Sequence, residues 1–179
     1  MKSLLACSLM MLIAAIAFSQ PAPQDADVRS AGIETSYDRT KDITTVRLMP
    51  VQISGKKDKY HSLHVSPSFS YPARVYVKPE IVDFELQTIV RGRLDSDLYV
   101  DFLIDGEKIF LSSSRRGIKH PVPGRVWMGE RLVFRMPYAT LFKLANAKQA
   151  AVRLDGISFE FKDAHKRALK TFAESAAKP

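Results

Sequence analysis

The sequence predicts an α+β domain: a mainly antiparallel β-sheet or sandwich of seven to eight strands, with two C-terminal helices packed on one face. Apolar and polar residues alternate through most of the chain, as they do in half-buried strands. The apolar period changes to that of a helix only after Pro137. An all-β sandwich with peripheral helices is the alternative reading of the same pattern.

Residues 1–19 have the layout of a secretory signal peptide. One charge at Lys2 precedes an apolar run that reaches Phe18, and a polar, proline-bearing stretch follows. The run is shorter than the roughly 20 apolar residues that a membrane-spanning helix needs. We therefore expect an exported protein, periplasmic or secreted, with no transmembrane segment after cleavage. Lipid anchoring at Cys7 is an alternative that the sequence disfavours, because most of the apolar run follows this cysteine.

Cleavage would leave a basic chain without cysteine. The only cysteine lies in residues 1–19, so the mature protein has no disulfide and no thiolate nucleophile or metal ligand. Its net charge falls from +8 to +7, because Lys2 is the only charged residue removed. An exported protein of this charge is expected to associate with anions such as a membrane surface or a cell-wall polymer. We do not expect nucleic acid as its partner.

The rest of the chain divides into a linker and one domain. Residues 20–36 contain almost no large apolar residue and predict a flexible linker. Residues 37–179 are then a single β-rich domain, long enough to bury a core.

Five segments between residues 43 and 136 have the period of a strand. Pro50 and Pro67 lie inside two of these segments. Because proline cannot donate a hydrogen bond to a β-ladder, we expect these strands at a sheet edge or with a bulge. The five segments are 43–53, 61–69, 82–90, 98–104 and 130–136.

Two Asp-Gly pairs, Asp105-Gly106 and Asp155-Gly156, each separate two apolar-rich runs. Asp-Gly is a preferred two-residue hairpin turn, because both positions tolerate a positive φ. We therefore interpret Asp105 and Asp155 as turn residues and not as catalytic carboxylates.

Helical spacing appears in two segments near the C-terminus. The first opens at Pro137, a residue favoured in the first turn of a helix. In the second, Asp163 is a candidate N-cap, and Lys166, Arg167 and Lys170 are expected on the exposed face.

Known catalytic and cofactor motifs are missing from the sequence. It has no His-Glu-x-x-His, no Gly-x-Ser-x-Gly and no phosphate-binding glycine loop. On a strand, His61 and His64 would point to opposite faces. Asp97 and Asp101 would share a face but lie about 13 Å apart, too far to chelate one ion. We expect no catalytic residue, metal or cofactor.

The candidate binding segment runs from Ser112 to Gly129. It is long for a connection in a compact domain, and no acidic residue occurs between Glu107 and Glu130. Arginine side chains can contact phosphate or carboxylate groups in a bidentate way. The candidate residues are Arg115, Arg116, Lys119, His120, Arg125 and Trp127. A solvated loop whose apolar residues tuck under the sheet is the alternative.

Three functions follow from these observations. The first is a non-enzymatic binding or interaction module of the cell envelope, for an anionic ligand or a protein partner. The second is a hydrolase or lyase of an envelope polymer that uses carboxylate or histidine chemistry. The third is a structural or assembly component whose strand edges near Pro50 and Pro67 pair with other proteins.

Overall fold

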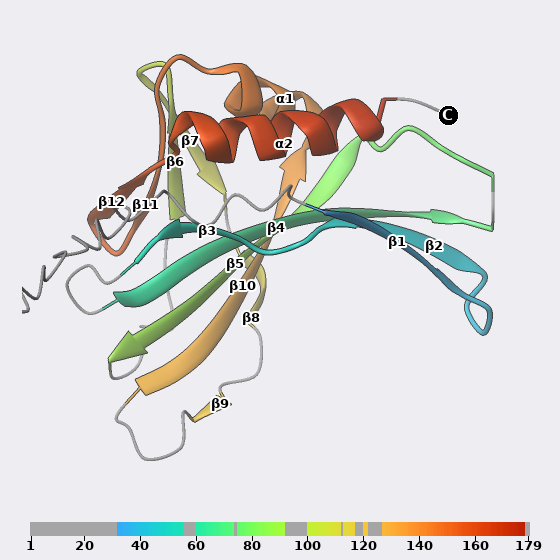
Figure 1. Cartoon of the computed structure of the whole chain (residues 1–179), viewed down its shortest axis with the longest axis horizontal. Coiled ribbons are helices and arrows are strands. Elements are labelled where there is room, and N and C mark those ends of the chain that lie inside the picture. The colour runs from blue at the N-terminus through green and yellow to red at the C-terminus, as the bar shows by residue number, and fades with distance from the viewer. Residues whose placement is uncertain are drawn as a thin grey trace, which may run out of the picture.

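The computed structural model of the chain (Figure 1) describes residues 32–55, 60–73, 75–91, 100–111, 113–116, 120–121 and 127–177. The expected signal peptide, Cys7 and most of the expected linker lie outside these residues. In the part that is described, no helix is long and apolar enough to cross a bilayer.

Two antiparallel sheets and two helices make up the described chain. Sheet A consists of β1 (Ile33–Asp38), β2 (Ile43–Leu48), β3 (Val51–Ser54), β4 (Tyr60–Pro72), β5 (Ile81–Arg91), β8 (Ser113–Arg116), β9 (His120–Pro121) and β10 (Trp127–Pro137). Sheet B consists of β6 (Val100–Ile104), β7 (Glu107–Leu111), β11 (Ala150–Leu154) and β12 (Ile157–Glu160). The helices are α1 (Tyr138–Asn146) and α2 (Asp163–Ser175).

The strand order places β4, β5 and β10 at the centre of sheet A. The path is β1-β2-β4-β5-β10-β8, with β3 also pairing with β4 and β9 with β10. Sheet B has the order β12-β11-β6-β7. Figure 1 shows sheet B and the two helices on the same side of sheet A. The α+β class predicted from the sequence is confirmed.

One core joins the two sheets and the helices. Phe84 of β5 and Phe102 of β6 meet edge to face, with ring centroids 5.3 Å apart. Phe172 of α2 contacts Phe69 of β4 in a similar way at 5.8 Å. These aromatic pairs link sheet A to sheet B and to α2, and each is worth about 0.5–1.5 kcal/mol beyond the area it buries.

The described residues contain twelve strands, more than the seven or eight expected. β1 begins at Ile33, inside the range assigned to the linker, so the expected linker boundary at residue 36 is wrong. Only Ile33 and Tyr37 of β1 are half-buried, and the strand is held by its backbone ladder to β2. Such an outer strand lacks the apolar alternation that reveals a strand in a sequence. The sequence does not predict β8 and β9 for a related reason: both strands are short and are held by backbone pairing with β10.

The two strand prolines have different positions from those expected. β2 ends at Leu48 and β3 begins at Val51, so the chain breaks at Pro50 as the sequence predicts. Pro67, however, lies in β4, which pairs with β2 and β3 on one side and β5 on the other. Pro67 itself pairs only with Phe84 of β5, because the ladders of β3 and β2 stop at Val65 and Ser68 on either side of it. It is buried, so the expected exposed edge near Pro67 is absent. The Ser66 hydroxyl donates to the Leu48 carbonyl at 2.7 Å and satisfies the backbone where β2 stops.

Both Asp-Gly pairs form the predicted hairpin turns. Asp105 and Gly106 have φ values of 48° and 85°, and Asp155 and Gly156 have 52° and 79°. Two consecutive positive φ angles define the turn that matches the twist of a hairpin.

The helix starts differ in detail from the sequence prediction. The N-cap of α2 is Lys162, so Asp163 is its first helical residue and not its cap. His165 supplies the cap interaction, because its Nδ1 accepts the Lys162 backbone N–H at 3.1 Å. Pro137 is the residue before α1 and not part of its first turn. It ends β10, so strand and helix follow each other directly.

Candidate functional site

The candidate binding segment is built into sheet A. Arg115 and Arg116 belong to β8, His120 belongs to β9, and Trp127 begins β10. The structure describes the backbone of these four residues; Lys119 and Arg125 lie outside the described residues. The segment is therefore not the single long loop that the sequence suggests. Its strands are short and carry little apolar alternation, so backbone pairing with β10 holds them.

The register along β10 brings the segment to one edge of the sheet. Arg116 pairs with Leu132 and Arg115 with Val133, while His120 pairs with Gly129. β8 and β9 thus lie along the side of β10 opposite β5, which is the arrangement drawn at the lower end of the sheet in Figure 1. Four of the six candidate residues are consequently gathered on β10 and its two outer neighbours.

A hollow of about 310 Å³ adjoins this edge. His64, Gln87 and Arg131 form one cross-strand row over β4, β5 and β10. Gly129 also lines the hollow, and because His120 is its partner across the ladder, the candidate segment borders the hollow. The remaining lining residues are Ser62, Thr88, Ile89 and Glu130.

A buried carboxylate fixes the arginine of the hollow. Glu85 is 3% exposed, yet it forms an ion pair with the Arg131 guanidinium. Its other oxygen accepts a hydrogen bond from Gln87 Nε2 at 2.7 Å. A carboxylate buried this deeply needs such partners, because the desolvation of an unpaired charge is costly. About half of the Arg131 side chain stays exposed, so its other N–H groups can reach a ligand.

His64 contributes a neutral imidazole to the hollow. Its pKa is lowered because burial disfavours the charged form. Arg131 is balanced by Glu85, and a second carboxylate, Glu130, also lines the hollow, so the lining residues supply no excess positive charge. The hollow thus supplies hydrogen-bonding groups on the strand, β10, with which the backbones of β8 and β9 pair.

Sequence reasoning missed Glu85, Gln87 and Arg131. Their alternation with apolar residues along β5 and β10 does indicate a polar face of the sheet. Arg131 and Glu85 are, however, 46 residues apart. The strand register decides which polar residue of one strand lies beside which residue of another. The register between strands that are distant in the chain cannot be predicted from this sequence.

The carboxylates that line the larger hollow on sheet B do not favour acid catalysis. Glu160 and Asp163 lie there, but Asp163 pairs with Lys166 at 2.9 Å. Hydrogen bonding to Lys166 lowers the pKa of Asp163, whereas a general acid of a glycosidase needs a raised pKa. Lys166 itself was expected to be exposed, but its side chain is only 12% exposed. Within the described residues, no group of three or more His, Cys, Asp or Glu could hold a metal ion.

The fold and the site define a class: a β-rich protein of two antiparallel sheets with two helices, in which a basic segment occupies the edge of the larger sheet. The chain matches no protein family model, no curated protein and no solved structure.

Proposed function

We propose that this chain is an exported, non-enzymatic binding module of the cell envelope that contacts an anionic ligand or protein partner through the β8-β9-β10 edge. The observation that carries the proposal is the placement of Arg115, Arg116 and His120 on strands that pair with β10. Pairing with β10 holds the backbones of β8 and β9 at one sheet edge, so this part of the chain loses less entropy on binding than a free loop would.

The neighbouring hollow supports the same proposal. Arg131 is fixed by Glu85 and half exposed, and Gln87 and His64 add neutral hydrogen-bonding groups beside it. These groups lie beside β10, the strand with which β8 and β9 pair. The net charge of +8 over the whole chain adds a general attraction for anions.

The proposal is tested by salt-dependent binding to polyanions. Heparin and vesicles that contain anionic lipid serve as probes, and the variant is Arg115→Ala/Arg116→Ala. We expect it to bind more weakly and with a smaller dependence of log affinity on log salt, by about one unit per cation removed. Unchanged affinity and slope would overturn the anionic proposal.

A charge-matched control separates this edge from general electrostatics. Arg39 follows β1 and Lys170 lies on α2, and both are exposed. Arg39→Ala/Lys170→Ala removes the same charge as the test variant. The proposal predicts a much smaller loss of affinity for this control, and equal losses in the two variants would show that only net charge matters.

A further inference from the structure

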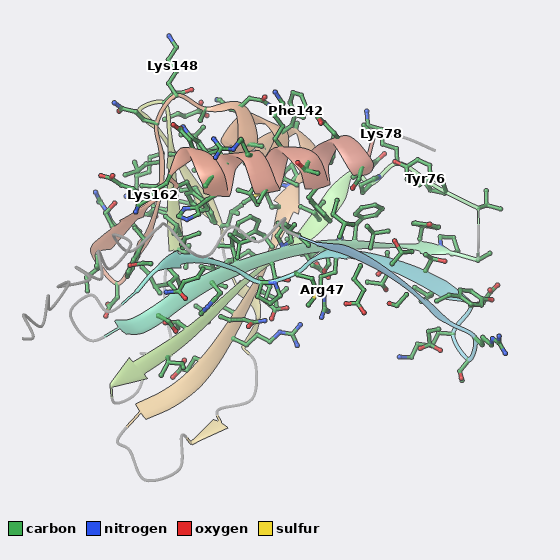
Figure 2. All side chains as sticks on the ribbon, in the orientation of Figure 1. Arg47, Tyr76, Lys78, Phe142, Lys148 and Lys162 are labelled. Atoms are coloured by element: carbon green, nitrogen blue, oxygen red, sulfur yellow. The ribbon has the colours of Figure 1, made fainter. Side chains whose placement is uncertain are left out.

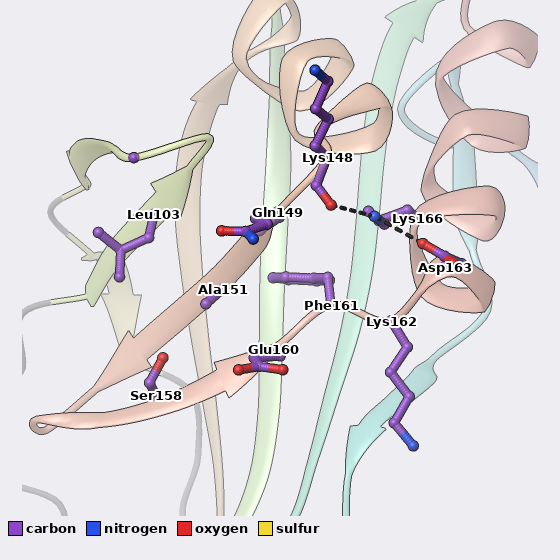
Figure 3. Close-up of a pocket in the computed structure, with 12 residues that line it drawn as sticks. Leu103, Lys148, Gln149, Ala151, Ser158, Glu160, Phe161, Lys162, Asp163 and Lys166 are labelled. Carbon is purple, nitrogen blue, oxygen red and sulfur yellow. Dashed lines mark hydrogen bonds and ion pairs between the residues drawn. The ribbon is translucent and has the colours of Figure 1, made fainter.

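A second and larger hollow, of about 670 Å³, lies on sheet B (Figure 3). Leu103, Ala151 and Glu160 form a cross-strand row over β6, β11 and β12, on the face opposite the buried Phe102 and Val152. The hollow is therefore on the outer face of sheet B, away from the core. Its volume falls in the range of about 300–1,000 Å³ that is typical of small-molecule sites.

Short side chains create this hollow. Ala151 and Ser158 stand on β11 and β12 where larger residues would fill the surface, and Gly106 closes the adjoining turn. A Cβ atom added at Gly106 would meet nothing within 4 Å. Leu103 and Ala151 leave a small aliphatic floor between the polar residues around it.

Hydrogen bonds fix the rim of the hollow. The Gln149 backbone N–H donates to the Asp105 carboxylate at 2.9 Å, and the Asp105 N–H donates to the Gln149 carbonyl at the same distance. On the other side, Lys166 Nζ donates to the carbonyls of Ala147 and Lys148 at 3.1 and 3.0 Å. Because loop 147–149 is held from both sides, a ligand would not have to order it.

Several polar groups at the hollow remain available. Among the described residues that line the hollow, the Gln149 side-chain amide, the Glu160 carboxylate and the ammonium groups of Lys148 and Lys162 make no hydrogen bond or ion pair. A carboxylate only accepts hydrogen bonds, an ammonium only donates them, and an amide does both. Figure 3 shows Gln149 and Glu160 on either side of Ala151, while the Lys148 side chain extends away at the rim, outward from the molecule as drawn in Figure 2.

We propose that this hollow binds a neutral, hydroxyl-rich ligand, namely a sugar ring of a carbohydrate. A ligand with one strong charge would be attracted by Lys148 and Lys162 and repelled by Glu160, or the reverse. Hydroxyl groups both donate and accept, so they satisfy Glu160 and Gln149 together. The aliphatic floor of Leu103 and Ala151 suits the C–H face of the ring. This proposal is independent of the anion-binding edge, because it uses other residues on the other sheet.

Titration of the ¹⁵N-labelled protein with neutral disaccharides tests the proposal. The probes are cellobiose and diacetylchitobiose, compared with glucuronate and octanoate. We expect saturable shifts of the Leu103, Gln149, Ala151 and Glu160 amide signals with at least one neutral disaccharide, at a dissociation constant on the order of 1 mM. No such shifts with either disaccharide, or tighter binding of glucuronate or octanoate at these residues, would overturn the proposal.

Variants show whether the hollow itself is used. Ala151→Leu fills the floor and Gln149→Ala removes the free amide, and each should weaken saccharide binding roughly tenfold. If Ala151→Leu fails to fold, Gln149→Ala decides alone, because the Gln149 side chain is exposed. Arg39→Ala and Arg115→Ala/Arg116→Ala should leave saccharide binding unchanged. Loss of saccharide binding in these controls would contradict the assignment to this hollow.

Discussion

Asp105 and Gln149, which are 44 residues apart, exchange two hydrogen bonds of 2.9 Å. The Asp105 backbone N–H donates to the Gln149 carbonyl, and the Asp105 carboxylate accepts the Gln149 N–H. A residue that the sequence identifies only as part of a turn therefore also ties the β6-β7 hairpin to the loop between α1 and β11. Asp105 therefore takes part both in a local turn and in a long-range contact.

Asp105→Ala should destabilise the protein, whereas Asp105→Asn should not. Asparagine keeps a side-chain oxygen for the Gln149 N–H and tolerates the positive φ of this position, while alanine does neither well. The lost hydrogen bond alone is worth about 0.5–1.5 kcal/mol. Urea unfolding of the two variants measures the difference. Equal stabilities would show that the Asp105 carboxylate contributes nothing beyond the turn.

Gly156→Val should lower the free energy of unfolding by about 1–3 kcal/mol, the cost of forcing a non-glycine residue into a rare backbone conformation. Gly156 has a φ of 79°, and a β-branched residue is the least able to adopt it. Thermal unfolding checks this value. Asp155→Asn is the control, because asparagine is also favoured in this turn, and it should keep the melting temperature of the wild type.

The fold class and both hairpin turns could be predicted from the sequence because they depend on local patterns. Apolar alternation marks strands that bury one face, and Asp-Gly needs no distant partner. β1, β8 and β9 could not be predicted in this way. Their backbones pair with β2 or β10, but these strands have too few apolar side chains for an alternating pattern to indicate the pairing. Proline is rare in interior strands, so the sequence favours an edge at Pro67. In the structure Pro67 lies in an interior strand, at the break between β2 and β3, where only β5 pairs with it.

Arg131→Met should destabilise the protein by about 1.5–3 kcal/mol, the usual value of a hydrogen bond to a charged group. It would leave the buried Glu85 carboxylate without its cation. Arg135→Met, at an exposed position on the same face of β10, is the matched control and should change stability by less than about 0.5 kcal/mol. Chemical denaturation compares the two variants.

A double variant tests the physical cause. Glu85→Gln removes the buried charge that Arg131 stabilises, so adding it to Arg131→Met should restore part of the lost stability. Further loss in the double variant would mean that Arg131 acts through packing and not through Glu85.

Acid should destabilise the protein partly through His165. Its pKa is lowered by burial and by the nearby Lys162, and its Nδ1 must be unprotonated to accept the Lys162 N–H. Below about pH 6.5 the unfolded chain binds a proton that the folded chain resists, so stability falls as pH falls toward the lowered pKa. One such group changes the free energy of unfolding by at most about 1.4 kcal/mol per pH unit.

His165→Gln isolates this contribution. Glutamine at the third helical position can accept the same backbone N–H but does not titrate. Unfolding free energies measured from pH 7.5 to pH 5 should therefore depend less on pH in this variant. The remaining slope includes His64, whose pKa is also lowered. An unchanged slope would contradict the role given to His165.

The candidate site was only partly predictable. The absence of acidic residues between Glu107 and Glu130 is visible in the sequence, and it indicated the basic segment. Its neighbours His64, Gln87 and Arg131 come from three strands whose register places them in one row. The hollow on sheet B depends on the shortness of Ala151 and Ser158, which has no meaning until β11 and β12 are paired.

Hydrogen-exchange mass spectrometry with a heparin oligosaccharide tests the binding edge most directly. We predict slower exchange in peptides that cover residues 113–116 and 127–133, with little change in the β1-β2 turn and in α2. Protection centred on α2, around Arg167 and Lys170, or no protection at all, would contradict the assignment of the anion-binding surface to the β8-β9-β10 edge.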